Sequence, residues 1–133
     1  MKYSGERSKI YTLLVVDYDE AYCANIYSDG EIEKVFNMHS EVPHKMRVGG
    51  QSAARFSRIR ENEIVLWYKR INKALMNVKG NISVAISFVN KRRFNKYLHN
   101  YVKEKIIRYD KNEYSGLTGI TQYISMLEKE KKN

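Results

Sequence analysis

The chain has 133 residues, of which 24 are lysine or arginine and 15 are aspartate or glutamate, so its formal charge is +9. This length suits one domain with its own core and is short for two, while the positive charge favours polyanionic partners such as nucleic acids. No apolar stretch approaches the ~20 residues needed to span a bilayer, and residues 1–9 are too polar for a signal peptide. We therefore expect a cytoplasmic location and no membrane partner.

The first third of the chain predicts three strands. Residues 10–16 are rich in β-branched and aliphatic side chains and stop at a turn-forming Asp-Tyr-Asp, which predicts a buried strand. Residues 21–27 predict a second strand. Asp29-Gly30 then predicts a tight hairpin turn before a third strand at residues 32–38. We expect an antiparallel meander.

Pro43, the only proline, ends the meander and begins a basic loop that runs to Gln51. Apolar residues then recur at helical spacing, which predicts one long helix from Ser52, as its N-cap, to about Val78, with Gly80 ending it. The apolar stripe of this helix consists of Phe56, Ile64, Trp67, Ile71, Ala74, Leu75 and Val78.

The remaining residues predict a strand at 82–89, an amphipathic helix at 91–105, a short strand at 106–109 and a last helix at 118–131. The expected fold class is α/β. It consists of a single mixed β-sheet of about five strands, antiparallel meander first, with packed helices that include one long helix after the glycine-containing loop.

The most informative motif is Gly49-Gly50-Gln51, followed closely by an arginine-rich helix. Adjacent glycines permit positive φ and let the backbone approach another molecule without a Cβ in the way. Glutamine adds a main-chain N–H and a side-chain amide. The motif predicts an exposed loop tip above a cationic helix, which suits insertion into a pocket made of nucleic acid.

The usual catalytic groups of a free-standing hydrolase are scarce in this sequence. His39, His44 and His99 lack metal-ligand spacing with one another or with Cys23, so we expect no metal site and no cofactor. Cys23 is the only cysteine and is expected to be an inert thiol packed in a strand. The neighbouring carboxylates Asp17 and Asp19 are expected to cap backbone N–H groups in a turn.

Residues 42–61 resemble the hallmark region of the class I peptide chain release factors of eukaryotes and archaea. In that family a Pro-Lys-containing approach leads into Gly-Gly-Gln-Ser and then Arg-Phe-x-Arg-x-Arg, and these features occur here in the same order. Further matches lie at residues 67–71, 79–86, 97–99 and 114–120, so the resemblance covers nearly the whole chain. Residues 1–133 resemble the middle domain alone, without the codon-reading or GTPase-partner domains, and are either a fragment or a solitary domain.

The resemblance implies a role in translation termination. The family triggers water to hydrolyse the peptidyl-tRNA ester in the ribosome's peptidyl transferase centre, so the domain would promote this reaction only together with the ribosome. By resemblance Gly49, Gly50 and Gln51 are the catalytic residues: the Gln51 main-chain amide stabilises developing negative charge, and the Gln51 side chain, commonly N-methylated in the family, lines the pocket.

The partners implied are the large-subunit ribosomal RNA, peptidyl-tRNA and, for a full-length factor, a translational GTPase; the isolated domain is expected to be a monomer. The residues expected to bind ribosomal RNA or tRNA are Lys45, Arg47, Ser52, Arg55, Arg58 and Arg60.

Three alternatives stay open at the level of sequence. One or two of the arginines could instead form salt bridges with Glu61 or Glu63, or lie along the sheet, and Arg60 is the first candidate for such a structural role because it lies close to the apolar stripe. The domain could belong to a ribosome-rescue hydrolase that needs no stop codon, or it could be an RNA-binding module whose glycines form a passive turn. Pelota-type factors lack the Gly-Gly-Gln loop, so its presence argues against that branch. Residues 46–48 are Met-Arg-Val where eukaryotic members have His-Gly-Arg, a variation closer to archaeal forms.

Overall fold

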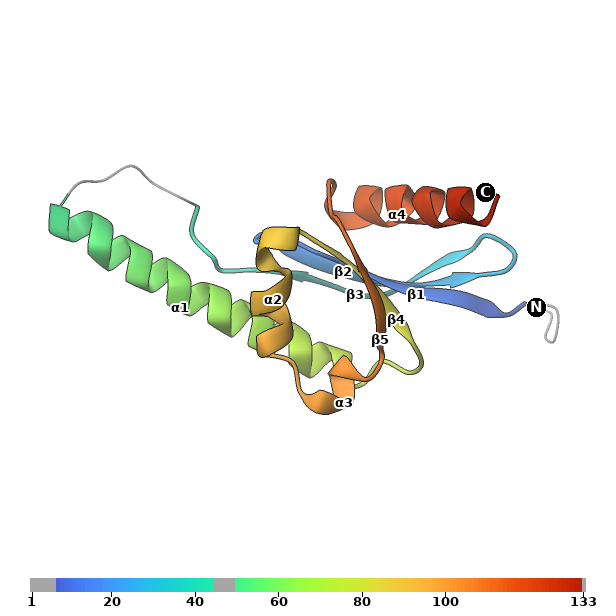
Figure 1. The fold of residues 1–133 in the computed structure, drawn as a ribbon, viewed down its shortest axis with the longest axis horizontal. Helices are drawn as coiled ribbons and strands as arrows, with labels where there is room; N and C mark the ends of the chain where they lie inside the picture. Colours follow the sequence, from blue (N-terminus) through green and yellow to red (C-terminus); the bar gives the residue numbers. More distant parts are fainter. Residues whose placement is uncertain (1–6, 45–49, 133) are drawn as a thin grey trace.

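The computed structural model describes residues 7–44 and 50–132, and for residues 50 and 51 it describes the backbone only. A five-stranded sheet lies at the centre of the described chain, with helices on both of its faces (Figure 1). The elements in chain order are β1 (Lys9–Val16), β2 (Glu20–Tyr27), β3 (Ile32–His39), α1 (Gly50–Leu75), β4 (Ile82–Ile86), α2 (Phe88–Lys96), α3 (Asn100–Lys103), β5 (Ile106–Asp110) and α4 (Gly116–Lys131).

The strand order is β3-β2-β1-β4-β5, and the sheet is mixed. Strands β1, β2 and β3 pair antiparallel as a meander, whereas β4 pairs parallel with both β1 and β5. The turn between β1 and β2 is closed by Asp17, whose Oδ1 accepts hydrogen bonds from the amides of Asp19 and Glu20 at 2.7 and 2.8 Å. The predicted fold class and the capping role of Asp17 are confirmed.

The sheet has a separate hydrophobic cluster on each face. Helices α1, α2 and α3 cover one face, where Trp67, Tyr68 and Phe94 are among the largest buried side chains. The ring of Tyr68 meets Phe94 edge-on at a centroid distance of 5.3 Å. Helix α4 covers the other face through Ile120, Tyr123 and Leu127 (Figure 1). Because β1 and β4 are covered on both faces, residues 12–16 and 82–86 are buried one after another instead of alternating between buried and exposed.

The largest differences from the predicted elements lie between residues 82 and 105, and α1 also ends at Leu75, before the predicted Val78. The strand predicted at 82–89 ends at Ile86, and Phe88 and Val89 begin α2 with 60% and 89% of their surface exposed. The helix predicted at 91–105 is two helices, because the chain turns after Lys96 and starts again at α3. His99 caps α3: its Nδ1 accepts from the Tyr101 amide at 3.0 Å.

Helix α4 sits unusually close to β1 at Gly119. A Cβ at this position would lie 2.5 Å from the Tyr114 carbonyl oxygen and 2.8 Å from Cγ1 of Val15. The carbonyl is backbone and cannot swing aside, so only glycine permits this approach. None of the helices in the described ranges combines the length and apolar character that a membrane-crossing segment requires.

An ionic network joins β5 to α4. The Arg108 guanidinium donates to both oxygens of Asp110, at 2.7 and 2.8 Å, and to both oxygens of Glu130, at 2.9 and 3.0 Å. The Tyr123 hydroxyl donates to the same Asp110 carboxylate at 2.5 Å. Partial burial alone would raise the pKa of Asp110, but the hydrogen bonds from Arg108 and Tyr123, with the Arg108 charge, lower it overall.

We expect this network to make folding stability depend on pH in the acid range. A carboxyl whose pKa is lower in the folded than in the unfolded chain stabilises the fold above its unfolded pKa of about 3.8, and that stabilisation is lost as pH falls through the lower, folded value. Asp110→Asn should therefore cost about 1–2 kcal/mol at pH 7 and progressively less below pH 4. Urea unfolding at pH 7, 5, 4 and 3 measures the difference.

Glu113→Gln is the matched control, because Glu113 is 63% exposed and meets Lys111 only at 4.0 Å. Its replacement should change stability by no more than about 0.5 kcal/mol at pH 7. A cost of Asp110→Asn that stays constant from pH 7 to pH 3 would contradict the assignment.

Candidate functional site

The amino-terminal half of α1 projects beyond the sheet (Figure 1). The first buried side chain of this helix is Ile64, and none of the preceding residues 52–63 is buried. At 1.5 Å per residue the unburied part of the helix is about 20 Å long. Gly50 and Gln51 therefore lie at the far end of this projecting part of α1, and the buried half of the helix, from Ile64 to Leu75, packs against the sheet.

Helix α1 begins two residues earlier than the sequence predicted. It starts at Gly50, so Ser52 is not the N-cap and Gln51 is the second helical residue. The first amides of an α-helix have no acceptor within the helix. The Gln51 N–H is one of these, and no acidic side chain occurs in the first turn to neutralise the positive end of the helix dipole. Such an end is suited to stabilising negative charge.

Three expected site residues lie outside the described residues: Gly49, Lys45 and Arg47. Of the others, Arg55 and Arg58 are exposed and line, with Ser52 and Ala54, one polar hollow beside the first turns of α1. Within the described ranges no carboxylate pairs with either arginine. The acceptor nearest in sequence, Glu61, instead pairs with Arg93 of α2.

Arg60 is separated from this exposed pair. It is half-buried, its Nε donates to the Pro43 carbonyl oxygen at 3.0 Å, and its guanidinium lies 4.8 Å from the centroid of the Tyr18 ring. Five positions after Arg55, it points to a different side of the helix. All three arginines were expected to bind RNA, with Arg60 the one most open to a structural role, and the structure divides them into two exposed side chains and one that contacts the protein itself.

The other titratable candidates have structural environments. Cys23 is buried in β2, and burial raises the pKa of its thiol to about 12, which confirms the expected inert thiol. His44 Nε2 lies 3.8 Å from the Asp19 carboxylate at the protein surface. Across residues 7–44 and 50–132, no three His, Cys, Asp or Glu side chains are grouped as a metal site would require.

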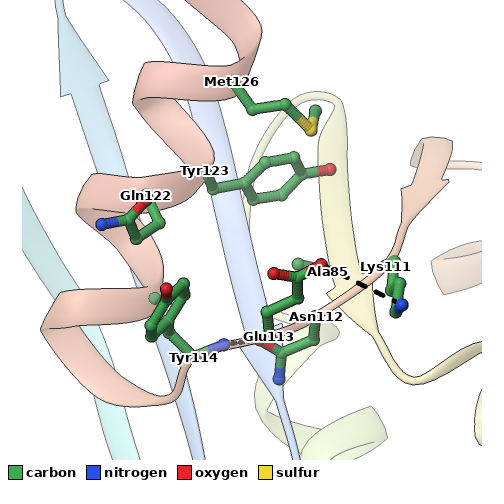
Figure 2. A pocket seen from close by; sticks show the side chains of 9 residues that line it. Ala85, Lys111, Asn112, Glu113, Tyr114, Gln122, Tyr123 and Met126 are labelled. Atoms are coloured by element: carbon green, nitrogen blue, oxygen red, sulfur yellow. Dashed lines mark hydrogen bonds and ion pairs between the residues drawn. The ribbon is translucent and has the colours of Figure 1, made fainter.

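A cavity of about 200 Å³ lies between α4, the end of β4 and the segment after β5 (Figure 2). Its wall is mainly apolar, with Tyr123 and Met126 of α4 facing Ala85 of β4. The charged groups at its rim, Lys111 and Glu113, face each other at 4.0 Å. None of the expected site residues lines it, so the cavity and the tip of α1 are separate features of the molecule.

The fold is that of an α/β domain with a projecting helix. The first turn of this basic helix lies well beyond the core of the domain. The family described as eRF1 domain 2 matches residues 10–133, and the chain belongs to that family. Peptide chain release factor subunit 1 of Thermococcus kodakarensis is 34% identical over 125 residues, which cover 86% of this chain and 30% of that protein. Subunit 1-2 of Methanosarcina acetivorans is 31% identical over 129 residues, covering 89% of this chain and 31% of that protein.

The chain thus spans about a third of the length of these curated relatives. Among solved structures, the archaeal translation termination factor aRF1 superposes with a TM-score of 0.64 at 18% identity, over 84% of this chain and 32% of that one. The Thermoplasma acidophilum Pelota protein superposes with a TM-score of 0.56 at 20% identity, over 86% and 31%. At these sequence identities the two structural likenesses support the fold of the chain only.

Proposed function

We propose that this chain is the domain of a translation termination factor that promotes hydrolysis of the peptidyl-tRNA ester in the ribosomal peptidyl transferase centre. The observation that carries the proposal is the position of Gln51 in the first turn of a projecting, cationic helix, in a chain of the eRF1 domain 2 family. The proposal places the domain on the ribosome, and therefore in the cytoplasm.

The chemistry follows from the position of the Gln51 amide in the first turn of α1. When water attacks the ester carbonyl, negative charge develops on the carbonyl oxygen and then on the departing ribose oxygen. A main-chain N–H aimed at this charge stabilises it without a titratable group, and the positive end of α1 adds to the effect. In the proposal the Gln51 amide supplies the N–H, the Gln51 side chain lines the pocket around the water, and Gly49 and Gly50 leave room for the tRNA end.

The reaction also requires that Gln51 be placed correctly at the ester, and the exposed arginines serve this requirement. Arg55 and Arg58 are free to make bidentate contacts to phosphate, and with Ser52 they lie within the first turns behind Gln51. Lys45 and Arg47 are proposed to add to the same cationic surface on the strength of sequence. The partners are ribosomal RNA of the large subunit, peptidyl-tRNA and, for the full-length factor, a translational GTPase.

The decisive experiment adds the protein that carries this chain to ribosomes with a labelled peptidyl-tRNA in the P site. The A site holds a stop codon, a sense codon or no codon. We expect release of labelled peptide with the stop codon alone. Release with all three would replace termination by codon-independent ribosome rescue. Absence of release in every case, while binding persists, would leave a passive RNA-binding module and end the proposal.

A further inference from the structure

The segment that leads toward the tripeptide is tied to the turn between β1 and β2. We call residues 39–43 the approach segment. The Ser40 amide donates to the Asp19 carbonyl oxygen at 2.9 Å, and the Ser40 hydroxyl donates to the Tyr18 carbonyl oxygen. The Val42 amide in turn donates to the Ser40 hydroxyl oxygen at 3.2 Å, and the Val42 side chain is buried in the core under α1.

The same turn is fixed from the helical side. Trp67 of α1 donates its indole N–H to the Asp17 carbonyl oxygen at 2.8 Å, and the Tyr18 hydroxyl donates to Asn90 of α2 at 2.6 Å. Arg70 of α1 donates to the His39 carbonyl oxygen at 3.2 Å. The turn and the start of the approach segment are therefore rigidly placed relative to α1.

Arg60 of α1 ties Pro43, at the end of the approach segment, to the same turn. Its Nε reaches the Pro43 carbonyl oxygen, and the face of its guanidinium lies over the Tyr18 ring. In sequence, Gln51 lies midway between Pro43 and Arg60. Arg60 lies on the helix that leaves the tripeptide, and Pro43 lies in the segment that leads toward it. The Arg60 side chain thus joins these two segments beside Tyr18 of the turn between β1 and β2.

From this geometry we infer that Arg60 is a positioning residue, which holds the approach segment against α1 and so sets where Gln51 lies, and that it is not an RNA contact. The inference rests on the proposed function. Electrostatic stabilisation of a reacting group requires placement to within about 1 Å, and a contact that joins the segments on the two sides of the tripeptide limits how far the tip can drift. A guanidinium is suited to the task because it donates in its plane while its face stacks on an aromatic ring.

The contact itself is tested on the 133-residue chain, apart from any release activity. Arg60→Ala should speed amide hydrogen exchange at Ser40 about tenfold, the loss expected for one hydrogen bond to a charged donor. Exchange at Leu14, in the centre of β1, should not change. The matched control is Arg58→Ala, an exposed arginine on the same helix, which should alter neither amide.

Release kinetics test the positioning role. In the full factor, Arg60→Ala should lower the release rate at saturating factor about tenfold and leave the half-saturating concentration unchanged. Arg58→Ala should do the reverse, raising the half-saturating concentration. Arg60→Lys keeps a donor for Pro43 but cannot stack as a plane, so it should restore part of the rate. The core variant Ile71→Val controls for stability: a similar loss of thermal stability should leave the release rate unchanged.

The inference is overturned if Arg60→Ala raises the half-saturating concentration at an unchanged saturated rate, since that is the behaviour of a phosphate contact. It is equally overturned if exchange at Ser40 is unaffected. A failure of the proposed function would give a different result. Substitutions at Gly50 and Gln51 would then leave peptide release unchanged, while Arg60→Ala would still speed amide exchange at Ser40.

Discussion

Gly50→Ala is expected to lower peptide release about 100- to 1,000-fold, the usual effect of removing one main-chain donor from a developing oxyanion. Gly50 is the first residue of α1, so its backbone is helical and alanine is compatible with it. The added Cβ acts on the partner instead, by keeping the Gln51 amide away from the ester. Release assays on stop-codon complexes measure the loss.

Gly50→Ala should lose release activity without losing stability. Alanine at a helical glycine stabilises by up to about 1 kcal/mol, so the inactive variant should unfold at the same or a higher urea concentration. Gln51→Ala should be less severe, because it keeps the main-chain N–H and loses only the side chain. Ser57→Ala, an exposed site further along α1, is the control and should keep full release. Normal release by Gly50→Ala would remove the basis of the proposed function.

Lys105→Met is expected to lower the free energy of unfolding by about 2–4 kcal/mol. Lys105 is only 9% exposed, and its ammonium donates to three carbonyl oxygens at the end of α1: those of Leu75 at 3.0 Å, Met76 at 3.3 Å and Val78. Its Nζ also lies 4.4 Å from the centroid of the Tyr101 ring. Methionine fills the same space but removes these three hydrogen bonds, and it removes a positive charge from the negative end of the helix dipole.

Urea unfolding at pH 7 measures the change, with Lys103→Met as the matched control. Lys103 belongs to α3 and is only half-buried, and within the described ranges its ammonium group makes no hydrogen bond or ion pair. Its replacement should change stability by no more than about 0.5 kcal/mol. Equal losses from the two substitutions would show that charge or helix propensity matters, and that the carbonyl contacts do not.

Local sequence was a good guide wherever a run of residues has one environment. The meander followed from β-branched runs separated by Asp-Gly and Asp-rich turns, and α1 followed from apolar residues at helical spacing. The prediction was wrong where an apolar run continues past the end of a strand. Phe88 and Val89 continue the pattern of β4, yet the chain has already left the sheet, because α2 must begin there to cover the face and return to β5.

The split among the arginines was indicated only in outline. The helical spacing puts Arg60 close to the apolar stripe, but the Pro43 carbonyl and the Tyr18 ring that engage it come from distant parts of the chain and could not be named from the sequence. Lys105 is a similar case, since the sequence placed it at the end of an amphipathic helix. Its burial depends on the end of α1 arriving beside β5.

The sequence was sufficient to identify the fold class, the family and the Gly-Gly-Gln motif. Each of these depends on the side-chain shape, spacing and backbone freedom of residues that are neighbours in the chain. The tertiary structure was needed to show that Gln51 belongs to the first turn of α1, that Arg60 contacts Pro43 and Tyr18, and that Lys105 caps a helix. These features arise from contacts between segments far apart in the chain, and the energy of a hydrogen bond or a buried charge depends on partners that no local pattern specifies.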